Sequence, residues 1–591
     1  MKGKKTSERK PAERMKAPLN QQKPKTAGKA SLQPVTPSWQ HWLAVSAIVL
    51  VTFICFQPAL NNHFLKTWDD SVYVTGNKLI NGLTGSHISE IFTFKKDLQK
   101  LTKNYHPLTT LSLAVNHQFA GLNPPSYYLT NILIHILNSL LVYLLIFLLT
   151  ERRFWGALFA GVLFGIHPMH VESVAWISER KDVLYAFFFI SGLIVYYFYV
   201  REQKPRYLAV VFLLFFLSVL SKAMAVVFPL TLFILDFLLQ RKWNFRLVIE
   251  KIPFFIVSAF FGILAVKIQS DGAMNDFHTY TFFQRIMHAS YGFLSYLYNF
   301  AAPFNLSGFY PYPFITDHGL LPLSFRVAPF VVVVILALAT GCLFLKNRLA
   351  RMFAAGMFFY LVTLVMVLQF ISVGKAITAD RYTYLPYIGV LLIMATLFTW
   401  LIENSQKTYK MAGLGFAALL IIVSGVFAAQ TRQRVTVWHD DFTLWNDVLN
   451  QFPDVRLNFI REKRASLNFQ NNDFDPAMKD YQVIASLDPQ EDEALNRIGQ
   501  IYGQHLHLID SSMVWFNKAY QVNPGNISLL KNMGVAYAIK TDYTRAIDLF
   551  LRAYAKDPSD TSLVYNIAAT YHALGNTVKA AEFDNLFRKG K

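Results

Sequence analysis

Adjacent carboxylates near the start of the chain are the first residues that could do chemistry. Asp69 and Asp70 follow Trp68 in a polar stretch directly after the first long apolar run. Crowding of two carboxylates raises the pKa of one of them toward neutral pH, which suits a general base or a metal ligand. An ordinary solvated pair that caps a helix explains the same residues without catalysis. Taken alone, the pair favours this capping interpretation over catalysis.

Two histidines and a carboxylate form a second cluster in the motif His-Pro-Met-His-Val-Glu. It places His167, His170 and Glu172 close together in the chain. These side chains could ligate a divalent ion or position a phosphate. The spacing favours hydrogen-bonded structural histidines, so no metal site is predicted. The two cysteines, Cys55 and Cys342, both lie inside apolar runs, which excludes a disulfide framework and a zinc motif.

Cationic side chains recur at the ends of the apolar runs. The clusters are Arg180-Lys181-Asp182, Lys222, and Asp380-Arg381-Tyr382. Charge at the end of a membrane span is costly unless it faces water, a partner or an anionic ligand. Snorkelling of long cationic side chains to lipid headgroups explains one or two of them. Three clusters on the same side as two carboxylates indicate a base beside a lipid phosphate that acts as the leaving group.

The apolar runs between these motifs predict the membrane spans that position them. The 591-residue chain is 53% hydrophobic and 16% charged, whereas a soluble domain carries about 25% charged residues. A helix needs about 20 apolar residues to cross about 30 Å of hydrocarbon. The predicted spans cover about residues 41–60, 127–149, 154–166, 183–200, 207–239, 252–268, 327–345, 352–371, 384–402 and 411–429. The run at 207–239 would be about 50 Å long as one helix, so we expect two short helices with Lys222 at the turn.

Segment 282–302 is only partly apolar, because Arg285, His288 and Asn299 are spread around it. We expect a re-entrant or interfacial helix there, which leaves about eleven crossings. The loops on one side of these crossings are basic; they cover residues 151–153, 201–206, 240–251, 346–351 and 403–410. Because basic loops remain in the cytoplasm, the N-terminus is predicted inside and the C-terminal region outside.

The first 38 residues form a basic segment of their own. Ten lysines and arginines stand against Glu8 and Glu13, so this segment supplies +8 of the formal net charge of +19. Its richness in proline, lysine and glutamine predicts a disordered cytoplasmic tail attracted to anionic lipid. Nucleic-acid binding is not predicted, because the excess charge is concentrated in this tail.

From residue 431 the pattern changes to a soluble helical repeat. Pro489, Pro524 and Pro558 are 35 and 34 residues apart. Small and aromatic residues keep the same register, as at Gly534, Tyr537, Ala546, Phe550 and Ala553. Small residues permit close helix approach, aromatics fill the groove, and proline ends the second helix. The sequence therefore predicts an all-α protein, with a multi-span domain at 39–430 and about four tetratricopeptide repeats in an α-solenoid at 431–591.

A polar stripe lies inside the span at 127–149. Asn131, His135 and Asn138 follow helical i, i+4, i+7 spacing, which places them on one face. We expect these side chains to form interhelical hydrogen bonds that fix the packing of the spans.

Several of these motifs occur in a fixed order along the chain. They are Trp68-Asp69-Asp70 with Asn77, the run 105–112 (Tyr-His-Pro-Leu-Thr-Thr-Leu-Ser), segment 131–135, His167-Pro168 with Glu172, Ser221-Lys222, and Asp380-Arg381-Tyr382 with Tyr384 and Pro386. Together with the trailing repeats, they resemble the transmembrane and tetratricopeptide-repeat-containing (TMTC) protein O-mannosyltransferases and their bacterial relatives. The likeness covers nearly everything from the first span to the C-terminus.

The resemblance implies a GT-C glycosyltransferase that moves one sugar from a polyprenyl-phosphate carrier to an acceptor hydroxyl outside the cytoplasm. Asp69 would be the base, supported by Asp70. The residues that would bind the lipid phosphate or substrate are Arg180, Lys222, Arg381, His106, His167, His170, Glu172, Asp380 and Tyr382. The repeat array is shorter than in eukaryotic members and the basic tail is typical of bacteria. A bacterial inner membrane is therefore expected, and neither mannose nor a cadherin-like acceptor is assumed.

The expected partners are membrane lipid, the carrier-linked sugar as donor, and an acceptor protein held by the repeats, which would raise its effective concentration. No cofactor or metal beyond the donor is predicted. Two alternatives remain open: a non-catalytic assembly factor for envelope proteins, and an enzyme that modifies a glycolipid or a polysaccharide. A transporter is disfavoured, because the acidic residues gather on one side rather than at the membrane midplane.

Overall fold

The computed structural model describes residues 1, 3, 37–93, 104–270, 280–313, 320–370, 374–403, 406–453, 455 and 457–589. It divides into a short unit, Met1–Ala44, and a main unit, Val45–Lys591. The predicted basic tail lies almost entirely outside the described residues. The described chain is predominantly helical, and its strands are the short pair β1 (Tyr310–Pro311) and β2 (Ala376–Thr378). The prediction of an all-α membrane protein is confirmed.

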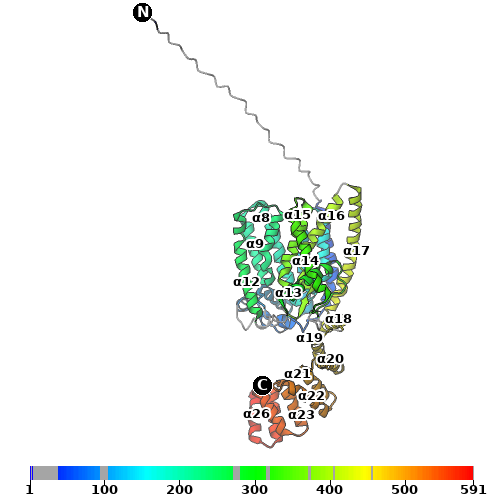
Figure 1. The fold of residues 1–591 in the computed structure, drawn as a ribbon. Helices are drawn as coiled ribbons and strands as arrows, with labels where there is room; N and C mark the ends of the chain where they lie inside the picture. Colours follow the sequence, from blue (N-terminus) through cyan, green and yellow to red (C-terminus); the bar gives the residue numbers. More distant parts are fainter. Residues whose placement is uncertain are drawn as a thin grey trace. The chain divides into compact units, whose positions relative to one another are not determined.

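Long apolar helices account for most of the chain before residue 438 (Figure 1). Their bounds are α1 (Ser38–Phe56), α4 (Pro107–Ala120), α5 (Pro124–Leu149), α6 (Phe154–Ile166), α7 (Val171–Ala175), α8 (Arg180–Glu202), α9 (Pro205–Ser221), α10 (Phe228–Leu238), α12 (Ile252–Ser270), α13 (Phe282–Ala301), α14 (Leu323–Leu343), α15 (Arg348–Leu364), α16 (Tyr387–Glu403) and α17 (Lys407–Val437). Shorter elements are α2 (Gly85–Ile91), α11 (Phe245–Ile249), and the tight turns η1 (Gln57–Asn61), η2 (Ser71–Thr75), η3 (Lys78–Ile80), η4 (Pro168–His170), η5 (Ile177–Glu179), η6 (Ala223–Val227), η7 (Val365–Val367) and η8 (Asp380–Thr383).

Seven helices in the described residues are long and apolar enough to cross a membrane, and a bent pair at 154–166 and 168–175 can form an eighth span. Shorter apolar helices lie at 205–221, 223–238 and 387–403. The protein is therefore an integral membrane protein. The figure of eleven crossings and the orientation of the termini stay predictions.

The run at 207–239 is broken at Lys222, as its length predicted. Helix α9 ends at Ser221, Lys222 has an extended backbone, and η6 leads into α10. Helices α8, α9 and α12 lie side by side (Figure 1). The side chain of Lys222, at the end of α9, is buried.

The polar stripe on α5 makes the interhelical hydrogen bonds expected of it. The Asn131 amide donates to the carbonyl oxygens of Val174 and Trp176. The His135 ring nitrogens lie 2.6 Å from the Tyr384 hydroxyl and 3.1 Å from the Gly165 carbonyl oxygen. Asn138 donates to the Val183 carbonyl at 2.8 Å. Since α5 also packs along α6 and α8, this stripe fixes the segment that joins the end of α6 to the start of α8.

Helix α13 has 20 residues, but it is not apolar enough to count among the candidate spans of the described residues. A capping box between Thr281 and Gln284 starts it. Its backbone carbonyls at Phe293 and Tyr296 accept hydrogen bonds from Tyr360 and Tyr387, each at 2.7 Å. Helix α13 is thus held by α15 and α16, and its re-entrant or interfacial character stays a prediction.

After α18 (Asp441–Gln451) the helices follow one another as antiparallel neighbours. They are α19 (Asn458–Gln470), α20 (Phe474–Leu487), α21 (Asp492–Gln504), α22 (Ile509–Val522), α23 (Ile527–Ile539), α24 (Tyr543–Tyr554), α25 (Thr561–Ala573) and α26 (Thr577–Lys589). They form four successive pairs, each packed on the next. This arrangement has the helix count and period of the predicted repeats, whose assignment as a tetratricopeptide solenoid stays a prediction.

Two glycines let the two helices within a pair approach each other closely. A Cβ atom added at Gly534 would lie 2.5 Å from the Phe550 ring, and one at Gly499 would lie 2.6 Å from the Phe516 ring. Both distances are shorter than van der Waals contact. Because both phenylalanines are buried, they have no free space to withdraw into.

We expect Gly534→Ala to destabilise the α23–α24 pair by about 1–3 kcal/mol, as overpacking of a filled core does. Hydrogen exchange of the full chain, read by mass spectrometry on peptides from α23 and α24, measures this directly. Gly415→Ala is the matched control, since a Cβ there meets nothing within 4 Å. Equal exchange in both variants would contradict the packing argument.

Candidate active site

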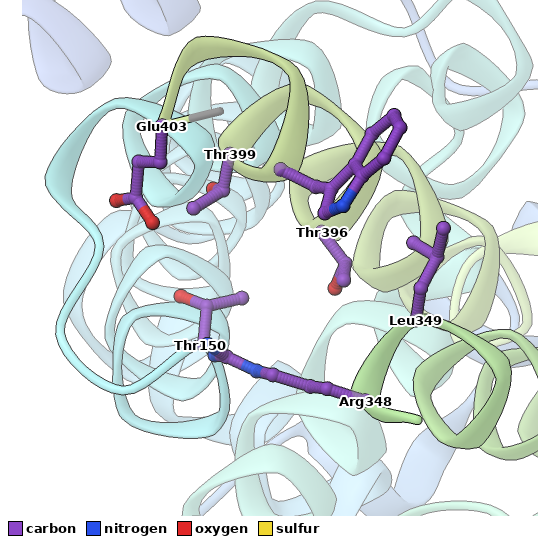
Figure 2. Close-up of a pocket in the computed structure, with 7 residues that line it drawn as sticks. Thr150, Arg348, Leu349, Thr396, Thr399 and Glu403 are labelled. Atoms are coloured by element: carbon purple, nitrogen blue, oxygen red, sulfur yellow. The ribbon is translucent and has the colours of Figure 1, made fainter. Parts of the chain in front are cut away.

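Two cavities with charged lining residues are candidates for the site. One, of about 220 Å³, lies between the ends of α5, α15 and α16, and Figure 2 shows Thr150, Thr396, Thr399 and Arg348 around it. Each of its three threonine hydroxyls donates to a carbonyl oxygen four residues earlier in its own helix. Glu403 pairs with Arg153. These groups are occupied by structural interactions, so this cavity offers no free base.

The second cavity, of about 510 Å³, contains an exposed carboxylate. Its lining residues are Lys66, Thr67, Trp68, Asp69, Ser71, Val72, Trp176, Gly308, Phe309, Gly374, Lys375, Ala376, Thr378, Ala379, Arg381, Tyr382, Phe459 and Lys463. They come from the loop after η1, from the turn before η5, from β2 and η8, and from α19. Of the acidic residues predicted from the sequence, Asp69 is the one that lines it.

The adjacent aspartates occupy different environments. Asp69 keeps 46% of its side-chain surface exposed and lies 3.8 Å from the Lys181 ammonium. Asp70 is fully buried, and its carboxylate accepts hydrogen bonds from the backbone N–H groups of Leu65 and Ser178 and from the Ser178 hydroxyl. Burial raises the pKa of Asp70 to about 6, although these three hydrogen bonds act to lower it. Asp69 is therefore the group that can meet a substrate, and Asp70 fixes the loop.

A second buried carboxylate holds the same loop from the opposite direction. Asp441, the first residue of α18, accepts from the backbone N–H groups of Lys66 at 2.8 Å and Thr67 at 2.9 Å. The Trp445 indole donates to the Thr67 hydroxyl at 2.8 Å. The backbone that presents Asp69 is thus clamped between α18 and the turn at Ser178.

Four tryptophans pack together beside the Asp69 loop, and two of them, Trp68 and Trp176, line the cavity. The Trp68 ring lies 4.6 Å from the Trp445 ring and 5.5 Å from the Trp176 ring, and Trp176 stacks on Trp438 at 5.5 Å. Trp176, Trp438 and Trp445 are almost completely buried. Large rings with few rotatable bonds keep this side of the cavity rigid and dry.

A buried carboxylate, Glu179, gathers three cations behind the cavity. Its oxygens lie 3.2 Å from the Lys181 ammonium, 3.5 Å from the Lys222 ammonium and 3.4 Å from Arg381 Nε. Lys222 also pairs with Asp182, and Arg381 with Glu172. Because Arg381 lines the cavity, this network delivers positive charge to the wall near Asp69.

Arg180 lies apart from this network. Its guanidinium donates to the Asn131 and Asn116 side chains, to the Ser112 hydroxyl and to the Tyr127 carbonyl. The residue is fully buried, and it does not line the cavity. Arg180 therefore braces α4 and α5 against the start of α8, whereas the adjacent Lys181 points to Asp69.

His106 stands close to the same cations without lining the cavity. It precedes α4, and Thr109 of that helix donates to the Ser221 carbonyl at 2.8 Å, next to Lys222. Burial lowers the pKa of His106 well below its usual value, and the charges of Lys181 and Lys222 lower it further. His106 is therefore neutral at physiological pH. Its Nδ1 has no hydrogen-bond partner among the described residues.

His167 and His170 are packed in an aromatic core. His167 Nε2 lies 3.1 Å from the Phe300 carbonyl oxygen and His170 Nδ1 lies 2.8 Å from the Phe164 carbonyl oxygen. Glu172 accepts from the backbone N–H of Arg381 at 2.9 Å as well as from its guanidinium. The three residues are directed to different partners, and no group of three potential metal ligands occurs in the described ranges.

The loop that carries Arg381 is fixed by a two-stranded sheet. Strands β1 and β2 are antiparallel, with Tyr310 opposite Thr378. The Tyr310 hydroxyl donates to Asp380 at 2.7 Å. Burial raises the pKa of Asp380, and the negative charge of Glu172 adds to this effect. Asp380 thus has a structural position below the cavity, while Tyr382 lines it.

Sequence reasoning did not single out four residues that shape this site, namely Glu179, Lys375, Phe459 and Lys463, and it named Lys181 only as a member of the Arg180-Lys181-Asp182 cluster. Glu179 and Lys181 flank Arg180, so the sequence shows that they lie near the charged cluster. The direction in which each side chain points depends on how the start of α8 is rotated about its axis, which the sequence does not show. Lys375, Phe459 and Lys463 belong to no motif. They reach the cavity because β2 and α19 meet the Asp69 loop in space.

Comparison with known proteins finds relatives of one kind. No protein-family model matches the chain. Human TMTC2, a protein O-mannosyl-transferase, is 42% identical over 94 residues, which cover 16% of this chain and 11% of that protein. Protein O-mannosyl-transferase F38B6.6 of Caenorhabditis elegans is 24% identical over 463 residues, covering 76% of this chain and 63% of the relative. Mouse TMTC3 is 28% identical over 163 residues, which cover 26% of this chain and 16% of that protein.

The chain thus matches less than two thirds of the length of each of these relatives. Among solved structures, ArnT from Cupriavidus metallidurans bound to undecaprenyl phosphate gives a TM-score of 0.32 at 13% identity, covering 90% of this chain and 81% of ArnT. The sequence resemblance to TMTC-type O-mannosyltransferases is confirmed by the three relatives.

The buried Asp70 predicts a specific pH dependence of stability. The folded-state pKa of about 6 lies above the ordinary value of 3.8, so the folded protein binds this proton more tightly than the unfolded chain. The stabilisation from this proton is complete below pH 3.8 and is lost as the pH rises through about 6. Asp70→Asn removes the titration. We expect the stability of the variant, relative to wild type, to increase between pH 4 and pH 7.

Thermal unfolding of the purified full chain at several pH values measures this difference. Asp557→Asn, in the exposed turn after α24, serves as control, and its offset from wild type should stay constant. A pH-independent offset for Asp70→Asn would show that the buried carboxyl does not titrate in this range.

Proposed function

We propose that this protein is a membrane glycosyltransferase that moves a sugar from a polyprenyl-phosphate carrier to a hydroxyl acceptor, a serine or threonine of a protein, on the non-cytoplasmic side. The observation that carries the proposal is one cavity in which Asp69 and Arg381 both line the wall. Glu179 joins Arg381 to Lys181, which lies beside Asp69. The relatives are named protein O-mannosyl-transferases, which supports sugar transfer by this chain. Mannose as the sugar is a property of those relatives and is not part of the proposal.

The chemical step follows from this pairing of a base with cations. Asp69 accepts the proton of the acceptor hydroxyl as the oxygen attacks the anomeric carbon of the donor. The bond between that carbon and the phosphate oxygen breaks, and its electron pair leaves on the polyprenyl phosphate. The sugar is transferred with inversion, the proton stays on Asp69 until it passes to water, and the carrier phosphate gains one negative charge.

The cations stabilise the negative charge that develops on the carrier phosphate, because their positions are fixed before the reaction begins. Arg381 faces the cavity, and Lys181 and Lys222 stand behind it, all three held by Glu179. Preorganised charge in a site screened from water is worth more than the same charge in solution. The clamped Asp69 loop holds the base within reach of the acceptor.

The same proposal assigns an orientation. The basic loops at 151–153, 240–251 and 346–351 would face the cytoplasm together with the N-terminus, and Asp69 and the C-terminal helix pairs would face the periplasm of a bacterial inner membrane. Acceptors would then be proteins that have crossed this membrane. Binding of undecaprenyl phosphate is stated for ArnT, and we extend a polyprenyl carrier to this chain as part of the proposal.

Asp69→Asn should reduce sugar transfer by about 10²–10⁴-fold, because it removes the general base while keeping the shape of the side chain. Intact-mass glycoproteomics of exported proteins measures transfer in a host that lacks the gene and carries either wild type or the variant. Asp548→Asn, on the exposed surface of α24, is the matched control and should keep full activity. Full activity of Asp69→Asn would refute the catalytic assignment.

Arg381 and Arg180 should respond differently to the same substitution. Arg381→Lys keeps a positive charge opposite Glu172 but loses the planar fork, so we expect binding of undecaprenyl phosphate to weaken about tenfold. Arg180→Lys loses several buried hydrogen bonds, so we expect a lower thermal midpoint with unchanged carrier binding.

Both quantities are measured on the purified full chain, the first by titration of the carrier in detergent and the second by intrinsic tryptophan fluorescence. If carrier binding instead depends on Arg180 and not on Arg381, the phosphate site lies at α4 and α5, and the arrangement proposed here is wrong.

A further inference from the structure

The 510 Å³ cavity has more positive charge than the transfer step uses. Four cationic residues line it, namely Lys66, Lys375, Arg381 and Lys463, and Asp69 is the carboxylate among its described lining residues. Arg381 is paired with Glu172 and Glu179. The three lysines have no ion pair of 4.0 Å or less with a described carboxylate. Their charge is therefore available to a ligand.

Two of these lysines lie close to one aromatic ring, that of Phe459. The Lys375 ammonium lies 4.6 Å and the Lys463 ammonium 5.1 Å from the centre of the Phe459 ring. Phe459 and Lys463 are one helical turn apart in α19, whereas Lys375 directly precedes β2. Cation–π attraction holds both ammonium groups over the ring. It does not neutralise them, so both ammonium groups can attract an anion that enters the cavity.

Lys463 is half-buried among charged groups, but no described carboxylate lies within ion-pair distance of it. Burial lowers its pKa, and the positive charge of Lys375 acts in the same direction. Carboxylates at Glu462, Asp441 and Asp69 act in the opposite direction, yet none forms an ion pair with it in the described structure. A carboxylate ligand placed between Lys375 and Lys463 would stabilise both ammonium groups.

We propose that Lys375, Phe459 and Lys463 form an acceptor subsite that binds an acidic side chain next to the serine or threonine that receives the sugar. The inference rests on the proposed function, because it takes Asp69 as the base for the acceptor. The carrier phosphate is assigned to Arg381, so the lysine–phenylalanine subsite is left for the acceptor.

The geometry favours a polypeptide as the occupant. The lining of the cavity includes Ala376 and Thr378, which belong to the extended strand β2. An extended acceptor segment can lie along such a wall with its hydroxyl at Asp69 and a flanking carboxylate between the lysines. The Phe459 ring offers an apolar face for the methylene groups of that flanking residue. Because α19 starts the helix pairs, a protein bound along them would continue directly into the cavity.

The test compares two fluorescent peptides with one threonine each, flanked by glutamates in one and by glutamines in the other. Binding to the full chain in nanodiscs is measured by fluorescence anisotropy at low and at physiological salt. We expect the glutamate peptide to bind about tenfold more tightly at low salt, with the preference falling as salt is added. The double variant Lys375→Gln/Lys463→Gln should bind both peptides equally.

Lys518→Gln is the matched control. Lys518 lies 4.1 Å over the Trp515 ring in α22, so it is also a lysine on an aromatic face but does not line the cavity. This variant should retain the preference for the acidic peptide. A preference that survives in the double variant, or that disappears in Lys518→Gln, would place acidic recognition elsewhere and overturn the proposal.

Two further measurements separate the possible sources of failure. If the double variant loses affinity for undecaprenyl phosphate, the subsite binds the carrier, and the acceptor assignment is wrong. Asp69→Asn should lose transfer but keep the preference for the glutamate peptide, since it removes no lysine. If that variant still transfers sugar, the proposed function fails while the peptide result stands on its own. Equal binding of both peptides to wild type overturns the subsite directly.

Discussion

The charged core of this protein depends on one buried carboxylate. Glu179 contacts Lys181, Lys222 and Arg381, which come from the start of α8, the break after α9 and the loop after β2. Removing a partner from such a group leaves an uncompensated charge, which costs about 3–5 kcal/mol. The network therefore joins segments that are up to 200 residues apart in the chain, and it holds the cations in the arrangement that the cavity wall needs. Asp182 and Glu172 complete the neutralisation from either side.

The two adjacent aspartates show how burial assigns different tasks to the same side chain. Asp70 is enclosed and uses its oxygens on Leu65 and Ser178, so it orders the loop. Asp69 is left partly exposed because its neighbour and Asp441 hold the backbone on both sides. A base that is exposed but immobile needs such a clamp, since an exposed aspartate on a free loop would not keep a fixed distance to its substrate. The sequence motif thus contains the base together with one half of its support.

Much of the fold followed from the sequence, because its signals are local. The lengths of the apolar runs predicted the helices and the break at Lys222, and the spacing of Asn131, His135 and Asn138 predicted their interhelical bonds. The geometry of the candidate site was harder to predict from the sequence. Motif order brought Asp69 and Arg381 into one group, but Arg180 and Lys181 are adjacent, and about 100° of rotation per residue sends one to α5 and the other to Asp69. The rotation of α8 about its own axis is set by packing against its neighbours, and no short motif encodes it. For the same reason His167 and His170, which look like ligands in sequence, are packed in an aromatic core.

The contribution of α18 and α19 changes how the C-terminal helix pairs should be regarded. A domain that only tethers an acceptor could be joined by any linker, and its contacts with the catalytic part would be incidental. Here Asp441 and Trp445 hold the loop that carries Asp69, Gln451 donates to the Leu306 carbonyl at 2.7 Å, and Phe459 and Lys463 line the cavity itself. These contacts make the first C-terminal helices part of the site. A change that displaced α18 would therefore disturb the Asp69 loop, so the proposed base and the proposed acceptor subsite are physically coupled in this chain.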